Sequence, residues 1–162
     1  MNKAYLLIGG NLGDRLANLQ HATACIEQRC GKVLLTSAIY ETEAWGFKDQ
    51  PSFYNQALII ATRLSATALM TELLAIEVQL GRIRSTPLGP RTIDLDIIYF
   101  NNEIIQTDSL LIPHPRLRER NFVLMPLVEI APDYIHPVLN KSNTLLLKEC
   151  GDISAVYKKT IF

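Results

Sequence analysis

Apolar residues along the chain follow two alternating patterns. Short apolar runs bounded by turn-forming residues predict four strands, at residues 4–8, 33–40, 53–62 and 92–100. Two intervening stretches repeat apolar residues at helical spacing and predict helices at about 14–30 and 65–80. Asp14 and Ser65 are suitable N-caps, and a glycine follows the end of each helix. The resulting order is strand, helix, strand, strand, helix, strand.

This order predicts an α+β fold with a ferredoxin-like βαββαβ core, in which the helices pack on one face of an antiparallel sheet. Residues 101–162 are expected to add a C-terminal extension with a short hairpin, Pro-rich loops and one more helix. The length suits one domain and no linker or repeat interrupts it, so we expect a single domain over residues 1–162. The fold alone says little about function, because it supports many activities.

Composition and charge narrow the classes of function. The 16 basic and 16 acidic residues balance, which argues against nucleic acid or a membrane surface as a partner. The chain has neither an apolar run of membrane-spanning length nor a signal-peptide pattern, so we expect a cytoplasmic location. Cys25, Cys30 and Cys150 form no C-x-x-C pair and predict buried thiols. Small-molecule substrates are expected, without an obligate protein partner.

The distribution of charge is more informative than its sum. Six of the nine Arg residues, and no Lys, lie between Arg82 and Arg120, and Arg is well suited to bidentate contacts with phosphate. The chain contains no G-x-x-x-x-G-K-[ST] loop and no G-x-G-x-x-G motif, which excludes the common nucleotide-binding signatures. Residues 9–14 could cradle an anion at a helix N-terminus, but a tight strand-to-helix turn is the favoured interpretation.

The strand at residues 92–100 carries the main candidate chemistry. Its period of two puts Thr92, Asp94 and Asp96 on one face and apolar residues on the other. On a central strand, two carboxylates roughly 7 Å apart repel each other unless a cation lies between them. Mg²⁺ suits such a pair, because it completes its shell with water and phosphate oxygens. The alternative is an exposed edge strand with two solvated Asp residues, which the nearby Arg residues make less attractive.

Several motifs occur in order over the chain as far as about residue 132. The clearest are Gly-Arg-Ile-Arg at 81–84, Gly-Pro-Arg-Thr-Ile-Asp-Leu-Asp-Ile at 89–97, Ile-Pro-His-Pro-Arg at 112–116 and Glu-Arg-Asn-Phe-Val-Leu-Met-Pro-Leu at 119–127. Upstream are Gly-Gly-Asn-Leu-Gly-Asp-Arg at 9–15, Tyr-Glu-Thr at 40–42 and Asp-Gln-Pro-Ser-Phe-Tyr-Asn at 49–55. Together they resemble the hydroxymethyldihydropterin pyrophosphokinases, the ATP-dependent enzymes of folate biosynthesis.

The resemblance implies transfer of diphosphate from ATP to the hydroxymethyl group of 6-hydroxymethyl-7,8-dihydropterin, with release of AMP. It implies that Asp94 and Asp96 hold two Mg²⁺ ions and that Arg82 and Arg91 act in catalysis. The residues implied for ATP binding are Glu77, Arg84, Ile97 through its backbone, His114 and Arg120. Those implied for pterin binding are Phe53 and Phe122 as aromatic walls, with Thr42, Trp45 and Asn55 reading the polar edge.

The sequence departs from the family pattern in a few places. Residues 85–88 form a shorter loop without a further Arg or aromatic residue, and Glu43-Ala44 stands where Pro-Pro is common. Ser109 and Leu111 replace a basic residue and a hydroxyl found in some relatives. Because the Asp pair and the Arg residues are present, we expect an active enzyme.

Three alternative functions are compatible with parts of this pattern. A ferredoxin-like RNA-binding module would carry aromatic and basic residues on its central strands, where this chain has acidic ones. A metal-dependent phosphohydrolase could use the same Asp pair with water as the acceptor. A non-catalytic relative could bind pterin or nucleotide without turnover.

Overall fold

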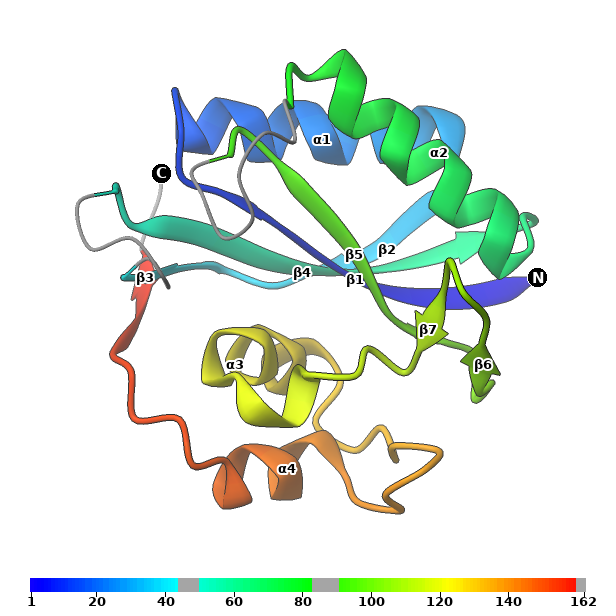
Figure 1. Ribbon diagram of the computed structural model, residues 1–162, viewed down its shortest axis with the longest axis vertical. Coiled ribbons are helices and arrows are strands. Elements are labelled where there is room, and N and C mark those ends of the chain that lie inside the picture. Colours follow the sequence, from blue (N-terminus) through cyan, green and yellow to red (C-terminus); the bar gives the residue numbers. More distant parts are fainter. Residues whose placement is uncertain (44–49, 83–90, 160–162) are drawn as a thin grey trace.

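The computed structural model describes residues 1–43, 50–82 and 91–159. In this part of the chain a twisted sheet lies between two layers of helices (Figure 1). None of the described helices combines the length and apolar character needed to cross a membrane.

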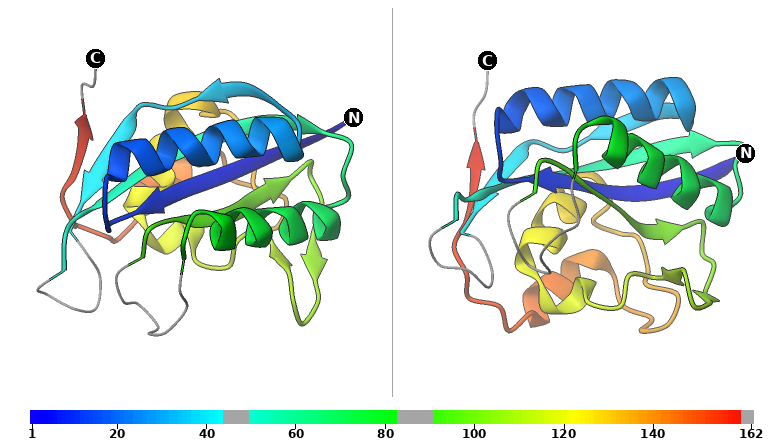
Figure 2. Two further views of the ribbon diagram at one scale, coloured as in Figure 1. Left: turned by 90° about the horizontal axis from the view of Figure 1, so that it is seen from above. Right: turned by 45° about the horizontal axis from the view of Figure 1, so that its top comes forward.

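The main sheet brings strands from both ends of the chain together. Its strands are β1 (Asn2–Gly10), β2 (Lys32–Thr36), β3 (Ile39–Thr42), β4 (Phe53–Thr62), β5 (Asp94–Phe100) and β8 (Val156–Lys159). The order across the sheet is β5-β1-β4-β3-β8, with β2 also beside β4, and these neighbours are all antiparallel (Figure 2). Strands β1 to β5 and the two helices between them form the predicted ferredoxin-like core.

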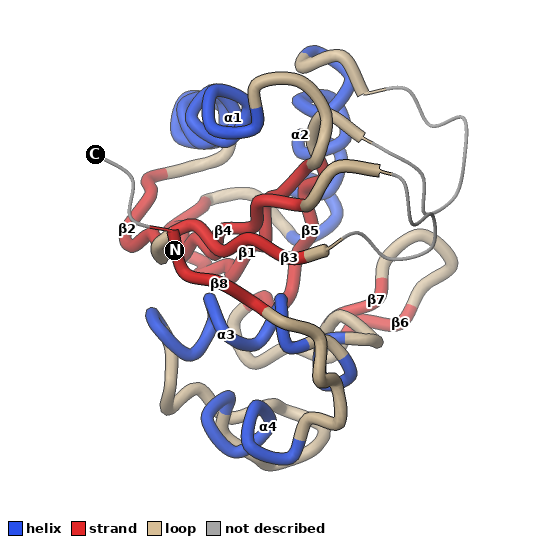
Figure 3. The backbone as a smooth tube through the Cα atoms, turned by 90° about the vertical axis from the view of Figure 1, so that its left-hand side faces the viewer, coloured by secondary structure: helices blue, strands red, loops and turns tan. Residues whose placement is uncertain are grey.

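Helices α1 (Arg15–Arg29) and α2 (Ala66–Gln79) pack on the same face of the sheet, as predicted (Figure 3). The side chains of Asp14 and Ser65 accept hydrogen bonds from the N–H groups of Ala17 and Ala68, so both predicted N-caps are confirmed. The apolar sides of these helices and the facing side of the sheet form one buried core.

The C-terminal extension covers the opposite face of the sheet. It contains β6 (Ile105–Gln106), β7 (Leu111–Ile112), the 3-10 helix η1 (Leu117–Glu119), α3 (Asn121–Ile130) and α4 (Asn143–Glu149). The expected hairpin is confirmed as β6–β7. Helix α3 shares a second buried core with the sheet, and α4 lies on its far side (Figure 1).

The prediction of a single further helix in the extension was wrong. Both α3 and α4 are helices, and β8 adds a strand that the pattern did not predict. Helix α4 has 7 residues and β8 has 4, which is too short for a periodic pattern to be recognised in either.

Two predictions about strands were also wrong. The single strand expected at 33–40 is divided into β2 and β3, because the chain leaves the ladder at Ser37 and Ala38. There Ser37 Oγ accepts a hydrogen bond from Ala57 N–H, and Glu129 of α3 accepts one from Ala38 N–H. Strand β5 lies at an edge of the sheet and not at its centre. The backbone N–H of Leu95 donates to Glu77 Oε2 at 2.8 Å, which satisfies a donor that no neighbouring strand pairs with.

Candidate active site

A pocket opens on the face of the sheet that α3 covers. Strands β1, β3, β4 and β5 contribute to its floor, and the residues before and within α3 form its wall. The lining residues are Leu7, Gly9, Thr42, Glu43, Phe53, Asn55, Arg91, Asp94, Asp96, Ile98, His114, Arg120, Phe122 and Val123. Nine residues that the sequence assigned to metal, ATP, pterin or catalysis are therefore brought together: Thr42, Phe53, Asn55, Arg91, Asp94, Asp96, His114, Arg120 and Phe122.

Strand β5 presents its two carboxylates to this pocket. Asp94 and Asp96 face it, whereas Leu95 and Ile97 pack in the core beneath α1 and α2, as the period of two predicts. The same period carries Ile98 to the pocket, and at this point the register against β1 shifts, so that Tyr99 also packs on the α3 side of the sheet. The family resemblance assigns only the backbone near Ile97 to ATP, and the side chain of Ile97 lies in the core.

Arg82 connects two acidic side chains beside the pocket, although Arg82 does not itself line it. Its Nη1 lies 2.6 Å from Asp94 Oδ1 and 3.1 Å from Glu77 Oε2, and Arg91 Nε lies 3.9 Å from Asp94 Oδ2. Glu77 is only 2% exposed and does not line the pocket. Its carboxylate binds both Arg82 and the backbone of β5, so Glu77 holds Arg82 against the strand that carries the Asp pair.

The carboxylate of Asp96 lies in different surroundings from that of Asp94. Among the described residues, no side chain or backbone group donates a hydrogen bond to its carboxylate. Burial raises the pKa of Asp96 well above its usual value, and the negative charges of Asp94 and Glu77 raise it further. A bound cation would relieve this unfavourable charge directly.

The donor set fits a magnesium ion. Within the described parts of the chain, no group of three or more His, Cys, Asp or Glu side chains could hold a metal ion by itself. The protein offers the two carboxylates of Asp94 and Asp96, and a pocket in which water or phosphate oxygens can complete the shell. Mg²⁺ commonly takes one or two carboxylates and keeps several waters, whereas a structural zinc site needs about four protein ligands.

His114 contributes a neutral imidazole to the pocket. Burial, with the nearby positive charge of Arg120, lowers the pKa of His114 to about 4. Its Nδ1 accepts a hydrogen bond from Arg116 N–H at 3.2 Å, so the ring proton belongs on Nε2. The backbone N–H of His114 donates to the Ile98 carbonyl at 3.0 Å, which keeps the ring beside β5. His114 can therefore donate a hydrogen bond without adding charge.

A further part of the pocket, beside these charged groups, carries aromatic and amide groups. Phe53 and Phe122 line it, with the guanidinium carbons of Arg91 and Arg120 at 5.0 Å and 5.7 Å from the respective ring centres. Asn55 is 6% exposed and approaches β1 closely, since a Cβ atom on Gly9 would lie 2.0 Å from Asn55 Oδ1. Glycine at this position is what allows the Asn55 amide to occupy the pocket.

Two residues assigned from the sequence, Trp45 and Arg84, lie outside the described residues. One residue that sequence reasoning missed is Asn11, which is 1% exposed. Its Oδ1 accepts from Arg91 N–H at 2.9 Å, and its Nδ2 donates to the Pro51 carbonyl at 2.9 Å and to Gln50 Oε1. Asn11 thus connects the backbone of Arg91 to the segment just before β4. The sequence signal that could have identified Asn11 is its position directly after two glycines.

The turn at residues 9–14 serves this connection. The N–H groups of Asn11 and Leu12 both donate to the Arg91 carbonyl, at 2.9 Å and 3.1 Å. Two of the donors that an anion would need are occupied within the protein. The interpretation as a strand-to-helix turn is therefore the better one.

Comparison with known proteins places this geometry in a family. The model of the 7,8-dihydro-6-hydroxymethylpterin-pyrophosphokinase family matches residues 5–132. The chain is 47% identical over 130 residues to the 2-amino-4-hydroxy-6-hydroxymethyldihydropteridine pyrophosphokinase of Bacillus subtilis, a match that covers 80% of this chain and 78% of that protein.

Longer proteins also contain a similar segment. The chain is 45% identical over 138 residues to the folic acid synthesis protein fol1 of Pneumocystis carinii, with 85% of this chain matched but only 19% of that protein. The wild-type HPPK-DHPS structure of Plasmodium falciparum with pterin and p-hydroxybenzoate has a TM-score of 0.74 at 18% identity. That match covers 91% of this chain and 43% of the Plasmodium chain, and it shows that the fold is shared.

Proposed function

The chain belongs to the 7,8-dihydro-6-hydroxymethylpterin-pyrophosphokinase family, and from this we propose that it transfers diphosphate from ATP to 6-hydroxymethyl-7,8-dihydropterin. The observation that carries the proposal is that one pocket combines charged side chains, which suit Mg²⁺ and phosphate, with an aromatic ring and an amide, which suit a pterin. The charged side chains are Asp94, Asp96 and Arg91, and the other two groups belong to Phe53 and Asn55.

The reaction joins the hydroxyl oxygen of the pterin to the β-phosphorus of ATP. The bond between that phosphorus and the oxygen bridging to the α-phosphorus breaks, and AMP leaves. Mg²⁺ bound at Asp94 and Asp96, with two ions expected, would neutralise and align the triphosphate. Arg82 and Arg91 stabilise the negative charge that develops on the transferred group. Glu77 and Asp94 hold Arg82 beside the strand that carries the Asp pair.

On the nucleotide side we assign Arg84, His114, Arg120 and the backbone near Ile97, as the family resemblance implies. The neutral His114 can donate from Nε2 without adding charge to the site. The family resemblance also implies that Glu77 binds ATP. Because its carboxylate is directed at Arg82 and at Leu95 N–H, we propose that it acts on the nucleotide site by orienting Arg82.

On the pterin side, Phe53 and Phe122 would stack on the planar ring. Asn55, Thr42 and Trp45 would bind its polar edge, where a heterocycle presents both donors and acceptors. The proposed compartment is the cytoplasm, where ATP is available, and the proposed partners are these two small molecules alone.

The test is an assay of nucleotide products with and without the pterin alcohol. The proposal expects AMP, formed only when both the pterin and Mg²⁺ are present. Release of ADP, or of phosphate without pterin, would instead support a phosphohydrolase that uses the same Asp pair. Pterin binding without any product would support the non-catalytic alternative.

A further inference from the structure

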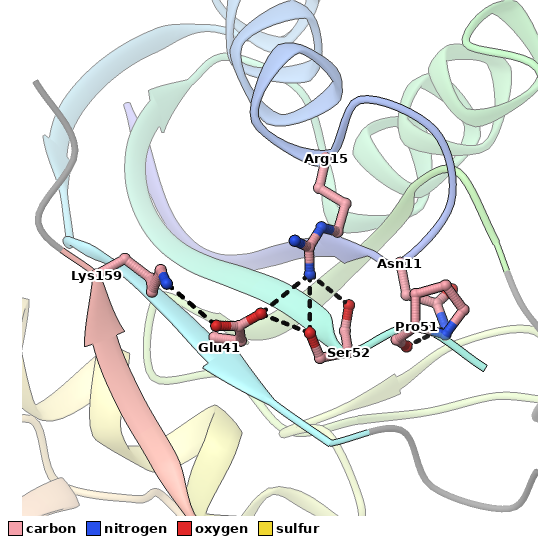
Figure 4. Close-up of polar contacts among 6 residues, drawn as sticks. All are labelled: Asn11, Arg15, Glu41, Pro51, Ser52 and Lys159. Carbon is pink, nitrogen blue, oxygen red and sulfur yellow. Dashed lines mark hydrogen bonds and ion pairs between the residues drawn. The ribbon is translucent and has the colours of Figure 1, made fainter. Parts of the chain in front are cut away.

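A polar cluster lies behind the aromatic side of the pocket, on the face of the sheet that α1 covers (Figure 4). It consists of Arg15 at the start of α1, Glu41 on β3, Ser52 just before β4, and Lys159 on β8. None of these four residues lines the pocket, and the proposed reaction assigns none of them a role.

The contacts within the cluster converge on the Glu41 carboxylate. Ser52 Oγ donates to Glu41 Oε2 at 2.5 Å, and Arg15 Nη1 lies 3.1 Å from the same oxygen. Lys159 Nζ lies 3.2 Å from Glu41 Oε1. Arg15 Nη1 also donates to the carbonyl and the hydroxyl of Ser52, at 3.0 Å and 2.8 Å (Figure 4).

The cluster is partly shielded from solvent. The side chains of Arg15 and Glu41 are 27% and 25% exposed, and the Arg15 guanidinium lies 3.9 Å from the centre of the Tyr54 ring. The hydrogen bond from Ser52, with the contacts of Lys159 and Arg15, lowers the pKa of Glu41 although burial opposes this. The carboxylate therefore stays ionised, and charge-assisted hydrogen bonds of this kind are among the stronger ones.

The position of the cluster relates it to the pocket. Glu41 directly precedes Thr42, and Ser52 directly precedes Phe53. Thr42 and Phe53 are paired across β3 and β4, and both line the pocket. Successive side chains of a strand point to opposite faces, so Glu41 lies behind the wall to which Thr42 belongs. The cluster thus joins the residues on either side of the connection between β3 and β4.

We propose that Glu41 is a positioning residue for the pterin, which it never touches. Together with Ser52 and Arg15 it holds Thr42 and Phe53 in the arrangement that the ring requires, so that less ordering remains to occur on binding. Lys159 contributes from β8, which lies beyond the residues 5–132 that the family model matches. This inference rests on the proposed function, because it needs the pterin as the ligand.

The experiment compares Glu41→Ala, Glu41→Gln and Ser52→Ala with the wild-type protein. The pterin KM and maximal rate are measured at saturating ATP, and an ATP analogue is titrated separately. We expect Glu41→Ala to raise the pterin KM by about tenfold and to leave ATP-analogue affinity within about twofold. Glu41→Gln, which keeps the shape and one acceptor, should give a smaller rise. The Glu41→Ala, Ser52→Ala double variant should be no worse than Glu41→Ala alone, because both act through one contact.

The matched control is Glu72→Ala, which removes an ion pair between α2 and α1 whose two residues do not line the pocket. Glu72 pairs with Arg29 at 3.0 Å, and their side chains are 34% and 35% exposed. Its loss should leave the pterin KM within about twofold of wild type. Urea unfolding of each variant identifies any loss of folded protein, and Glu41→Gln serves as the test if Glu41→Ala does not fold.

Two results would overturn the inference alone: a pterin KM within twofold of wild type in Glu41→Ala, or an equal loss of affinity for pterin and ATP analogue. In both cases the wild-type protein would still form AMP from ATP and pterin, so the proposed function would stand. A wild-type protein that neither binds the pterin nor forms AMP would overturn both.

Discussion

At the scale of single residues, Asp94 and Asp96 have different surroundings although they share one face of β5. Asp94 is already neutralised in part, with Arg82 Nη1 at 2.6 Å and Arg91 Nε at 3.9 Å. For Asp96, burial and two neighbouring carboxylates raise the pKa, and no hydrogen-bond donor reaches it among the described residues. A cation at this site would therefore stabilise the charged form of Asp96 more than that of Asp94.

Asp96→Asn should separate the effect on activity from the effect on stability. We expect AMP formation to fall by a factor on the order of 10² to 10³ at saturating Mg²⁺, since a charged ligand for the metal is lost. Without metal, the variant should be at least as stable as wild type in urea, because a repelling buried charge has been removed. Near-normal activity with saturating Mg²⁺ would remove Asp96 from the metal site.

Arg91 should matter more for the rate than for nucleotide binding. If its guanidinium stabilises charge that grows in the transition state, Arg91→Ala should lower the maximal rate by roughly 10²- to 10³-fold. Arg91→Lys keeps a charge but loses the planar fork, so it should recover only part of the rate. Steady-state kinetics and titration of an ATP analogue measure the two effects. A normal maximal rate with weakened ATP binding would reduce Arg91 to an anchor for the nucleotide.

At the scale of elements, Glu129 connects α3 to the short break between β2 and β3. Its Oε1 accepts from Tyr40 OH at 2.5 Å, and its Oε2 accepts from Ala38 N–H at 2.9 Å. Lys158 of β8 lies 3.6 Å away. The break in the strand would leave the Ala38 N–H without a ladder partner, and the helix supplies one. One carboxylate therefore links the helix to β3 and to β8.

Glu129 should make the free energy of unfolding depend on pH in the acidic range. Burial opposes its ionisation, but the hydrogen bonds from Tyr40 and Ala38 prevail and lower the pKa of Glu129. A carboxyl whose pKa is lower in the folded state adds stability above its unfolded pKa of about 4.3, and loses it as the pH falls through the folded value. We expect Glu129→Gln to cost about 1–2 kcal/mol at pH 7 and progressively less below about pH 4.

Urea unfolding from pH 7 to pH 3 checks this expectation. Glu149→Gln is the control, because Glu149 forms an ion pair with Lys141 in which both side chains are 44% exposed. That variant should change the free energy of unfolding by less than about 1 kcal/mol. A cost for Glu129→Gln that did not vary with pH would contradict the role given to its charge.

At the scale of the whole molecule, the pocket exists only where several elements meet. Arg91 directly precedes β5, the Asp pair lies on or near that strand's start, and Thr42 and Phe53 lie on β3 and β4. The remaining wall comes from the C-terminal extension. Asn11 joins the segment before β5 to the segment before β4, since it forms hydrogen bonds with both Arg91 and Pro51. Substrates that contact every side of the pocket should therefore stabilise the entire fold.

Ligand binding should raise the melting temperature. At about 100 times its dissociation constant, a ligand that binds only the folded state adds roughly 2.7 kcal/mol. For a protein of this size, that corresponds to an increase on the order of 5–10 °C. We expect this increase with Mg²⁺ and an ATP analogue, and little of it when the metal is chelated or Asp96 is replaced by Asn. An equal increase without Mg²⁺ would contradict the proposed metal site.

The sequence by itself determined the alternation of strands and helices, both N-caps, and the face of β5 that carries the carboxylates. These features depend on periodicity and on residues that are close in sequence, so a local pattern contains them. The motifs also identified nine residues that share the pocket. The pattern failed for β8 and α4, which are too short to show a period, and for the split between β2 and β3, which depends on Glu129 from a distant helix.

Only the tertiary structure decided which distant residues meet. Asn11 and Arg91 are separated by 80 residues, and Ala38 and Glu129 by 91. Glu41, Ser52 and Arg15 lie on three separate segments, yet they form one cluster behind the pocket. Such contacts follow from strand order, register and the docking of helices, which are properties of the packed chain. A one-residue change in the register of β3 would turn Glu41 to the other face of the sheet, and no local pattern of polar and apolar residues specifies that choice.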